Sequence, residues 1–198
     1  MSSIDWTVQL HEQTDWIWRH QTRPRLAGLT DEEYFWEPVP GCWSIRPRGE
    51  TTAPITGGTG DHQIEFAIPE PEPAPVTTIA WRLGHLIVGV LGMRNMNHFG
   101  GPRMDYYEFD YASTAKAALE QLDEAYAGWS AGVRGLDADA LAAPCGQAEA
   151  PFDKEPMAML VLHINREVIH HCAEVALLRD LYGARAADPA NRTGRRSD

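Results

Sequence analysis

The last third of the sequence contains residues whose types and spacing could bind a metal ion. Steps of three or four positions through residues 155–182 give Leu160, Ile164, Glu167, His171, Glu174 and Leu178. At about 100° per residue these positions form one narrow stripe along a helix. The stripe is apolar at both ends, so we expect it to face the core, where an unpaired carboxylate costs several kcal/mol. Glu167 and His171, one turn apart, therefore predict a site at which a cation compensates the buried charge.

A third ligand is available in a second apolar segment. His85 stands alone in the run WRLGHLIVGVLGM, between Gly84 and Gly89, which would allow a neighbouring helix to approach closely. Two imidazoles and one carboxylate, with positions left open to water or substrate, are typical of catalytic zinc. Nickel or iron would also accept this set. The sequence thus predicts a divalent-metal site, most simply zinc, at His85, Glu167 and His171.

Two interpretations need no metal. A glutamate and a histidine four positions apart also occur as a surface ion pair, and a single core histidine is often satisfied by a backbone carbonyl. His163 and His170 lie at the edge of the stripe, and either could replace a member of the trio. His98 lies on nearly the opposite side of its helix from His85, so we leave it out.

The remaining pattern indicates the elements that must position these residues. Apolar residues recur with helical spacing at 5–20, 76–99, 113–133 and 155–182. Thr30 followed by Glu33 is a capping-box signature for one short helix. Residues 38–75 are rich in proline and glycine, with one strand-like piece at 63–68, and a loop of this length often lines a site. We predict an all-α antiparallel four-helix bundle over residues 1–183, with a long irregular insertion between helices one and two and a disordered tail at 184–198.

Composition restricts the class of protein. A chain of 198 residues favours one domain, and a net charge of -11 argues against nucleic acid as a partner. Cys42, Cys145 and Cys172 form no CxxC pair, which fits a reducing cytoplasm, and the N-terminus lacks the pattern of a secretion signal. The longest apolar stretch, 83–93, is too short to span a bilayer. We expect a cytoplasmic protein with no membrane partner.

Three segments resemble a known family. HINREVIHHCAEVALLRDLYG resembles the final helix of the DinB-like superfamily of metal-dependent four-helix bundles, WRLGHLIVGVLGMRN is similar to its second helix, and LTDEEYFWEPVPGCWSIRP to its opening segment. Many members use three histidines, the last two as HxxxH. Here Glu167 takes the first place of that pair, as in the branch of mycothiol-dependent maleylpyruvate isomerase, which has a His, Glu, His set. The resemblance therefore implies the same ligands, His85, Glu167 and His171.

The resemblance also implies an activity. It is that of a thiol-dependent S-transferase or isomerase, acting on an electrophilic substrate with a low-molecular-weight thiol such as mycothiol or bacillithiol, in a homodimer. Arg82 would hold a carboxylate, Glu174 would serve as general base or as a partner of a ligand histidine, and Trp43 and Arg46 would line the pocket mouth. Arg82 could equally be a surface arginine, and Trp43 a packing residue. Two further hypotheses are a metal-dependent hydrolase that activates water at the same site and a non-catalytic, stress-related metal-binding dimer.

Overall fold

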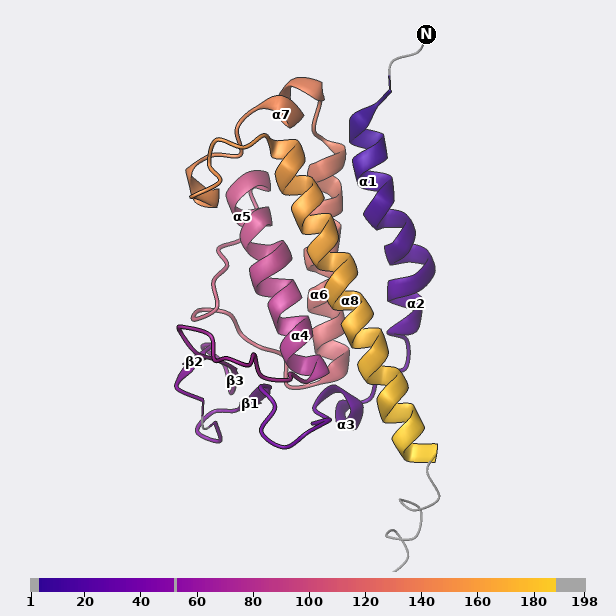
Figure 1. The fold of residues 1–198 in the computed structure, drawn as a ribbon, viewed down its shortest axis with the longest axis vertical. Helices are drawn as coiled ribbons and strands as arrows, with labels where there is room; N and C mark the ends of the chain where they lie inside the picture. Colours follow the sequence, from indigo (N-terminus) through magenta and orange to yellow (C-terminus); the bar gives the residue numbers. More distant parts are fainter. Residues whose placement is uncertain (1–3, 52, 188–198) are drawn as a thin grey trace, which may run out of the picture.

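The computed structural model describes residues 4–51 and 53–187, and four long helical segments make up most of it (Figure 1). The first comprises α1 (Trp6–Ile17), the π-helical η1 (Trp18–Thr22) and α2 (Arg23–Arg25). The second comprises α4 (Ile79–His85), the π-helical η2 (Leu86–Gly92) and α5 (Met93–Phe99). The third is α6 (Ala115–Arg134) and the fourth is α8 (Met157–Ala187), preceded by the short α7 (Ala138–Ala142) and the 3-10 turn η3 (Gln147–Glu149). The predicted helical segments are therefore present, with ends that differ by a few residues.

Side-chain caps explain where three of the segments begin. Asp5, Thr78 and Thr114 have extended backbones, and each accepts a hydrogen bond from the backbone N–H three residues further on. Such a cap satisfies one of the N–H groups that the first helical turn leaves without a partner. Local sequence thus sets the start of α1, α4 and α6.

The four segments meet in one apolar core. Leu83 and Leu86 on the second segment, Leu122 and Trp129 on α6, and Ile164 on α8 are almost completely buried. They are the positions that helical periodicity assigns to an inward face. None of the helices in the described ranges is both long and apolar enough to cross a bilayer.

The order of helix directions differs from the prediction. Gly84, near the start of the second segment, lies against Tyr111, just before α6, whereas Phe99 at its end packs on Trp129 with ring centroids 5.5 Å apart. The second segment and α6 therefore run in the same direction, and a wholly antiparallel order is wrong at this step. Residues 100–114 return along the second segment to make this possible (Figure 1). At about 3.3 Å per extended residue they can readily cover the roughly 30 Å of a 20-residue helix.

The insertion is not wholly irregular, because it folds into a small sheet. β1 (Ile45–Pro47), β2 (Ile55–Gly57) and β3 (His62–Phe66) pair antiparallel in the order β1-β3-β2. Ile45 pairs with Ile64, and both side chains are buried against Gly84 of α4. The predicted strand corresponds to β3. Strands of three residues are too short to display an alternating pattern, so β1 and β2 could not be recognised.

The short helix and the C-terminal segment also differ in detail from the sequence-based prediction. α3 (Asp31–Tyr34) begins at Thr30, whose hydroxyl accepts from the Glu33 N–H at 3.2 Å, as the capping box predicts. The Glu33 side chain, however, binds Arg179 on α8 instead of returning to the cap. Helix α8 continues to Ala187, so the first four residues of the expected tail are helical. The rest of that predicted tail, 188–198, lies outside the described residues.

Candidate metal centre

His85 lies where regular helix gives way to a wider turn. It is the last residue of α4, and the π-helical η2 follows directly, with the Met93 N–H donating to the Val88 carbonyl five residues earlier. The Arg94 guanidinium donates to the Gly89 carbonyl within this turn at 2.5 Å. Single π-helical turns inside α-helices are frequent at functional sites. The local geometry therefore indicates a functional element in the segment next to His85.

The His85 imidazole is held on two sides. Its Nδ1 lies 2.6 Å from the Tyr106 hydroxyl, and its ring stacks on Trp81 with centroids 5.4 Å apart. Burial, with smaller contributions from His171 and Arg82, lowers the pKa of His85 to about 3, so the ring is neutral at pH 7. Burial raises the pKa of Tyr106 to about 12, so its hydroxyl stays protonated. In the tautomer in which Nδ1 of His85 carries the proton and donates it to the Tyr106 hydroxyl, the Nε2 lone pair is free to bind a cation.

His171 faces His85 from α8. The two rings are perpendicular, with centroids 4.8 Å apart, and His171 is only 7% exposed. Its Nδ1 lies 2.7 Å from Oε2 of Glu174, and its Nε2 lies 3.6 Å from Oε2 of Glu167. A carboxylate that accepts the proton of one imidazole nitrogen leaves the other nitrogen as a ligand, an arrangement common around metal ions.

Glu167 lies between the buried histidine and two more exposed side chains. Its second oxygen, Oε1, is 3.5 Å from Nδ1 of His163 and 3.8 Å from Nε of Arg166. The structure thus brings His85, Glu167 and His171 into one region between α4 and α8, with His163 at its edge. The chemistry of this donor set suits a divalent cation.

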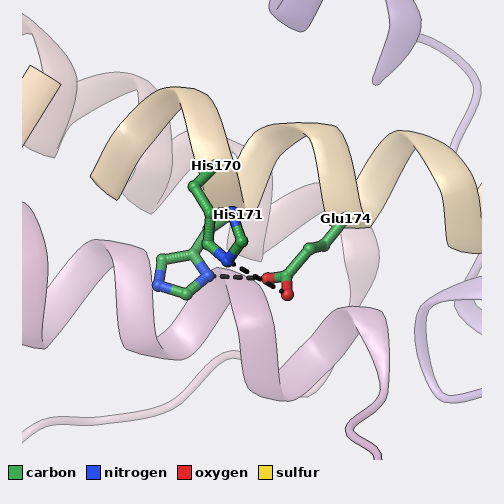
Figure 2. A group of neighbouring side chains, drawn as sticks. All are labelled: His170, His171 and Glu174. Atoms are coloured by element: carbon green, nitrogen blue, oxygen red, sulfur yellow. Dashed lines mark hydrogen bonds and ion pairs between the residues drawn. The ribbon is translucent and has the colours of Figure 1, made fainter. Parts of the chain in front are cut away.

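A more compact group of possible ligands lies one turn further along α8. His170, His171 and Glu174 each offer a ligand atom within 4.8 Å of the others, and Figure 2 shows both imidazoles turned toward the Glu174 carboxylate. His170 is largely exposed, with Nε2 3.4 Å from Oε1 of Glu174. Within the described chain the trio of His85, Glu167 and His171 does not meet this spacing. Sequence periodicity had placed His170 only at the edge of the stripe.

A second compact group has partners of its own. It consists of His11, Glu12 and Asp15 on α1. Nε2 of His11 lies 2.8 Å from the Ser130 hydroxyl, and Asp15 forms an ion pair with Arg19 at 2.8 Å. Because the buried members already have polar partners, this group is explained without a metal.

Arg82 and Glu174 form one unit beside the two histidines. Nε of Arg82 lies 3.2 Å from Oε2 of Glu174, the same oxygen that contacts His171. The guanidinium also lies over the Trp81 ring, 5.3 Å from its centroid. Arg82 is therefore engaged with a carboxylate of its own chain, and it supports the residue that orients His171.

The two predicted residues of the insertion occupy different places. Trp43 is fixed beside the start of α4 by backbone hydrogen bonds with Val76 and Thr78 at 3.0 and 2.9 Å, and its ring lies 6.2 Å from that of Trp81. Arg46 instead forms ion pairs with Glu65 and Glu37 at 2.9 and 2.8 Å. Trp43 thus reaches the histidines through Trp81, whereas Arg46 is bound within the insertion.

Sequence reasoning missed Tyr106 and Trp81, the two residues that hold His85. Tyr106 lies in the aperiodic segment 100–114, where no pattern singles it out. One indirect signal was present in Gly89, because a side chain at that position would collide with the Tyr106 hydroxyl. A glycine in a buried helix often marks such a close approach.

Removing the Tyr106 hydroxyl should weaken metal binding without unfolding the protein. Loss of a hydrogen bond to a ligand histidine typically costs about 10–100-fold in metal affinity. We expect Tyr106→Phe to lower zinc affinity by that amount in a competition titration against a chromophoric chelator. Tyr107→Phe, at a largely exposed neighbouring position, is the matched control. Equal affinity in the two variants would exclude Tyr106 as a support for His85.

The three cysteines are placed where they cannot act as nucleophiles. All are free and buried, and burial raises the pKa of each, that of Cys172 to about 12. Because only the thiolate reacts, we expect negligible labelling by a disulfide reagent at pH 8 in the native protein and labelling of all three thiols in denaturant. A thiol that reacts rapidly before unfolding would contradict this assignment.

A cavity of about 570 Å³ opens next to Glu167. On α8 it is lined by Leu160, His163 and Arg166, and the last two also contact Glu167. Arg94 and Glu149 also line the cavity, and they form an ion pair of 3.1 Å. A space of this size is within the usual range for small-molecule sites.

Fold and site together define a helical protein with histidine and glutamate side chains suited to a metal ion. A family model of the DinB superfamily matches residues 13–175, which include every predicted ligand. The chain therefore belongs to the DinB superfamily, whose members are generally metal-binding proteins. Comparison with curated proteins and with solved structures found no match.

Proposed function

We propose that this protein binds a divalent metal, most simply zinc, through His85, Glu167 and His171, and that it acts as a thiol-dependent S-transferase or isomerase. The observation that carries the proposal is the geometry of the two histidines. Their rings face each other at 4.8 Å, and each Nδ1 has a protein partner, Tyr106 or Glu174. When Nδ1 of each ring carries the proton, both Nε2 atoms are left as ligands beside Glu167.

We favour this trio over the group in Figure 2 for two reasons. His85 and His171 are held by packing and hydrogen bonds, whereas His170 is 63% exposed and would have to be ordered on binding. In addition, the partly buried guanidinium of Arg82 lies 3.2 Å from Glu174 and would repel a cation there. Arg166 contacts Glu167 at 3.8 Å, and it is 70% exposed, so solvent screens its charge more strongly.

A bound divalent metal would stabilise a thiolate over a thiol at neutral pH. The residues of the chain would supply the rest of the chemistry. Tyr106 and Glu174 orient the imidazoles, and Oε1 of Glu174 can accept the thiol proton and pass it to Nε2 of the exposed His170. The cavity with His163 and Arg166 would hold the electrophile.

The thiolate sulfur would form a bond to an electrophilic carbon. In an addition, the displaced electron pair of the double bond would take up a proton, and in a substitution it would depart with the leaving group. In a transfer the thioether is released. In an isomerisation the carbon–sulfur bond breaks again after the carbon skeleton has rotated, and the free thiol is recovered.

The finer part of the proposal rests on the His, Glu, His order, which resembles the mycothiol-dependent maleylpyruvate isomerase branch. We propose a thiol of the mycothiol or bacillithiol type and a cytoplasmic homodimer. Exposed apolar side chains on α1 and α8, among them Trp16 and Leu177, support a protein–protein contact that involves these helices.

The test is thiol dependence of turnover. Zinc-loaded protein is mixed with monochlorobimane and, in turn, mycothiol, bacillithiol or glutathione, and formation of the fluorescent thioether is followed. We expect a rate above the uncatalysed one with at least one thiol, and its loss in Glu167→Ala. Turnover of ester or amide substrates without any thiol would replace the proposal with hydrolysis. Bound metal without turnover of any substrate would replace the proposal with a non-catalytic metal-binding protein.

A further inference from the structure

A second cavity lies on the other side of the second helical segment, away from α8. It has a volume of about 530 Å³ and is enclosed by α5, α6 and the returning segment 100–114. No residue of α8 lines it, and none of the proposed metal ligands does. We propose that this cavity is a binding site for a small organic amine in its protonated form, with an apolar or aromatic body. The proposal is independent of the function proposed for the metal centre.

The walls of the cavity are suited to an apolar body. Ile87, Phe99, Met104, Phe109 and Ala125 contribute apolar surface, and Gly92 and Gly128 carry no side chain that would fill the space. Apolar walls with a few polar groups are the usual composition of a small-molecule site. Two aromatic rings in the lining, those of Phe99 and Phe109, can also attract a cation through their faces.

One polar group in the wall lacks a partner. Asn95 is 6% exposed, and its Nδ2 donates to the Ala125 carbonyl at 2.8 Å, which fixes the orientation of the amide. Its Oδ1 is buried and accepts no hydrogen bond. An unsatisfied buried acceptor is costly. Asn95 lines the cavity, so a small shift of its amide that brings Oδ1 to a ligand N–H would relieve that cost.

The charge around the cavity selects the sign of the ligand. Glu108 is neutralised by Arg103 through an ion pair of 2.8 Å. Asp110 and Glu124 also line the cavity and are exposed, and no cationic side chain of the described ranges forms an ion pair with either. Two uncompensated carboxylates and one unpartnered carbonyl oxygen are all acceptors. A protonated amine supplies both the positive charge and the N–H donors that they lack.

The experiment measures binding of 2-phenylethylamine to the full-length protein by calorimetry at low salt, with 2-phenylethanol and 3-phenylpropanoate as neutral and anionic controls. We expect the amine to bind about tenfold more tightly than the alcohol, because each partly screened carboxylate contributes a few-fold. The anion should bind more weakly still. Equal affinity for amine and alcohol would overturn the proposal.

Four variants locate the site. Glu124→Gln should weaken amine binding about threefold, whereas Glu120→Gln, one turn away on α6 and outside the lining, should not. Ala125→Leu should fill the cavity and abolish binding, with thermal unfolding showing that the variant is folded. His171→Ala should bind the amine as the wild type does. Binding that survives Ala125→Leu, or that is lost with His171→Ala, would place the amine elsewhere and refute the proposal.

Discussion

Replacing His85 by alanine is expected to abolish tight zinc binding, whereas replacing His170 by alanine should leave it unchanged. His171 belongs to both possible ligand groups, so its removal cannot distinguish them. His85 belongs only to the proposed trio, and His170 only to the group of His170, His171 and Glu174. Loss of a direct ligand should cost more than the roughly 10–100-fold that follows loss of a supporting hydrogen bond.

The measurement is a zinc competition titration, with elemental analysis of protein purified without a polyhistidine tag. His163→Ala is the matched control, because His163 lies on the same helix as His170, is also partly exposed and contacts Glu167. Circular dichroism should show the same helix content in all three variants. If His170→Ala loses the metal and His85→Ala keeps it, the metal is bound by the group of His170, His171 and Glu174.

The largest effect on stability is expected from Glu33→Ala. Glu33 is 7% exposed in its side chain, and both of its carboxylate oxygens accept from Arg179, at 2.7 and 3.1 Å. Arg179 also donates to the Ala27 carbonyl, so one arginine ties the segment before α3 to α8. Removing one member of a buried pair leaves the other charge without a counterion, which typically costs about 3–5 kcal/mol. Urea unfolding monitored by tryptophan fluorescence measures the loss.

Asp180→Ala provides the comparison. Asp180 pairs with Arg25 at 2.6 Å between the same two parts of the molecule, but the side chains are 66% and 48% exposed. Solvent screens such a pair, so we expect a loss of no more than about 1 kcal/mol. Similar losses in the two variants would show that burial does not set the strength of the Glu33 pair.

The tertiary structure decided features of the site that no local pattern encodes. Tyr106 meets His85 only because residues 100–114 return along the second helical segment, and this path also makes α6 parallel to that segment. The nitrogen of His85 that is free depends on Tyr106, which lies 21 residues away along the chain. The nitrogen of His171 that is free depends on Glu174. The sheet over α4 was hidden because β1 and β2 are too short for alternation to appear.

By itself, the sequence determined which helices form and part of the face that each one buries. The spacing of apolar residues predicted the four helical segments. On α8, Leu160, Ile164 and His171 of the predicted stripe are buried, but Glu167, Glu174 and Leu178 are only half-buried, so the stripe lies at the edge of the inward face. Periodicity reports the environment of each residue along its own element, because burial repeats with the helical turn. Periodicity does not indicate which elements contact each other, because those contacts depend on the paths of the connecting loops. Many paths are possible, since the free-energy cost of closing a loop rises only slowly with its length. The partners of the histidines could therefore be read only from the folded chain.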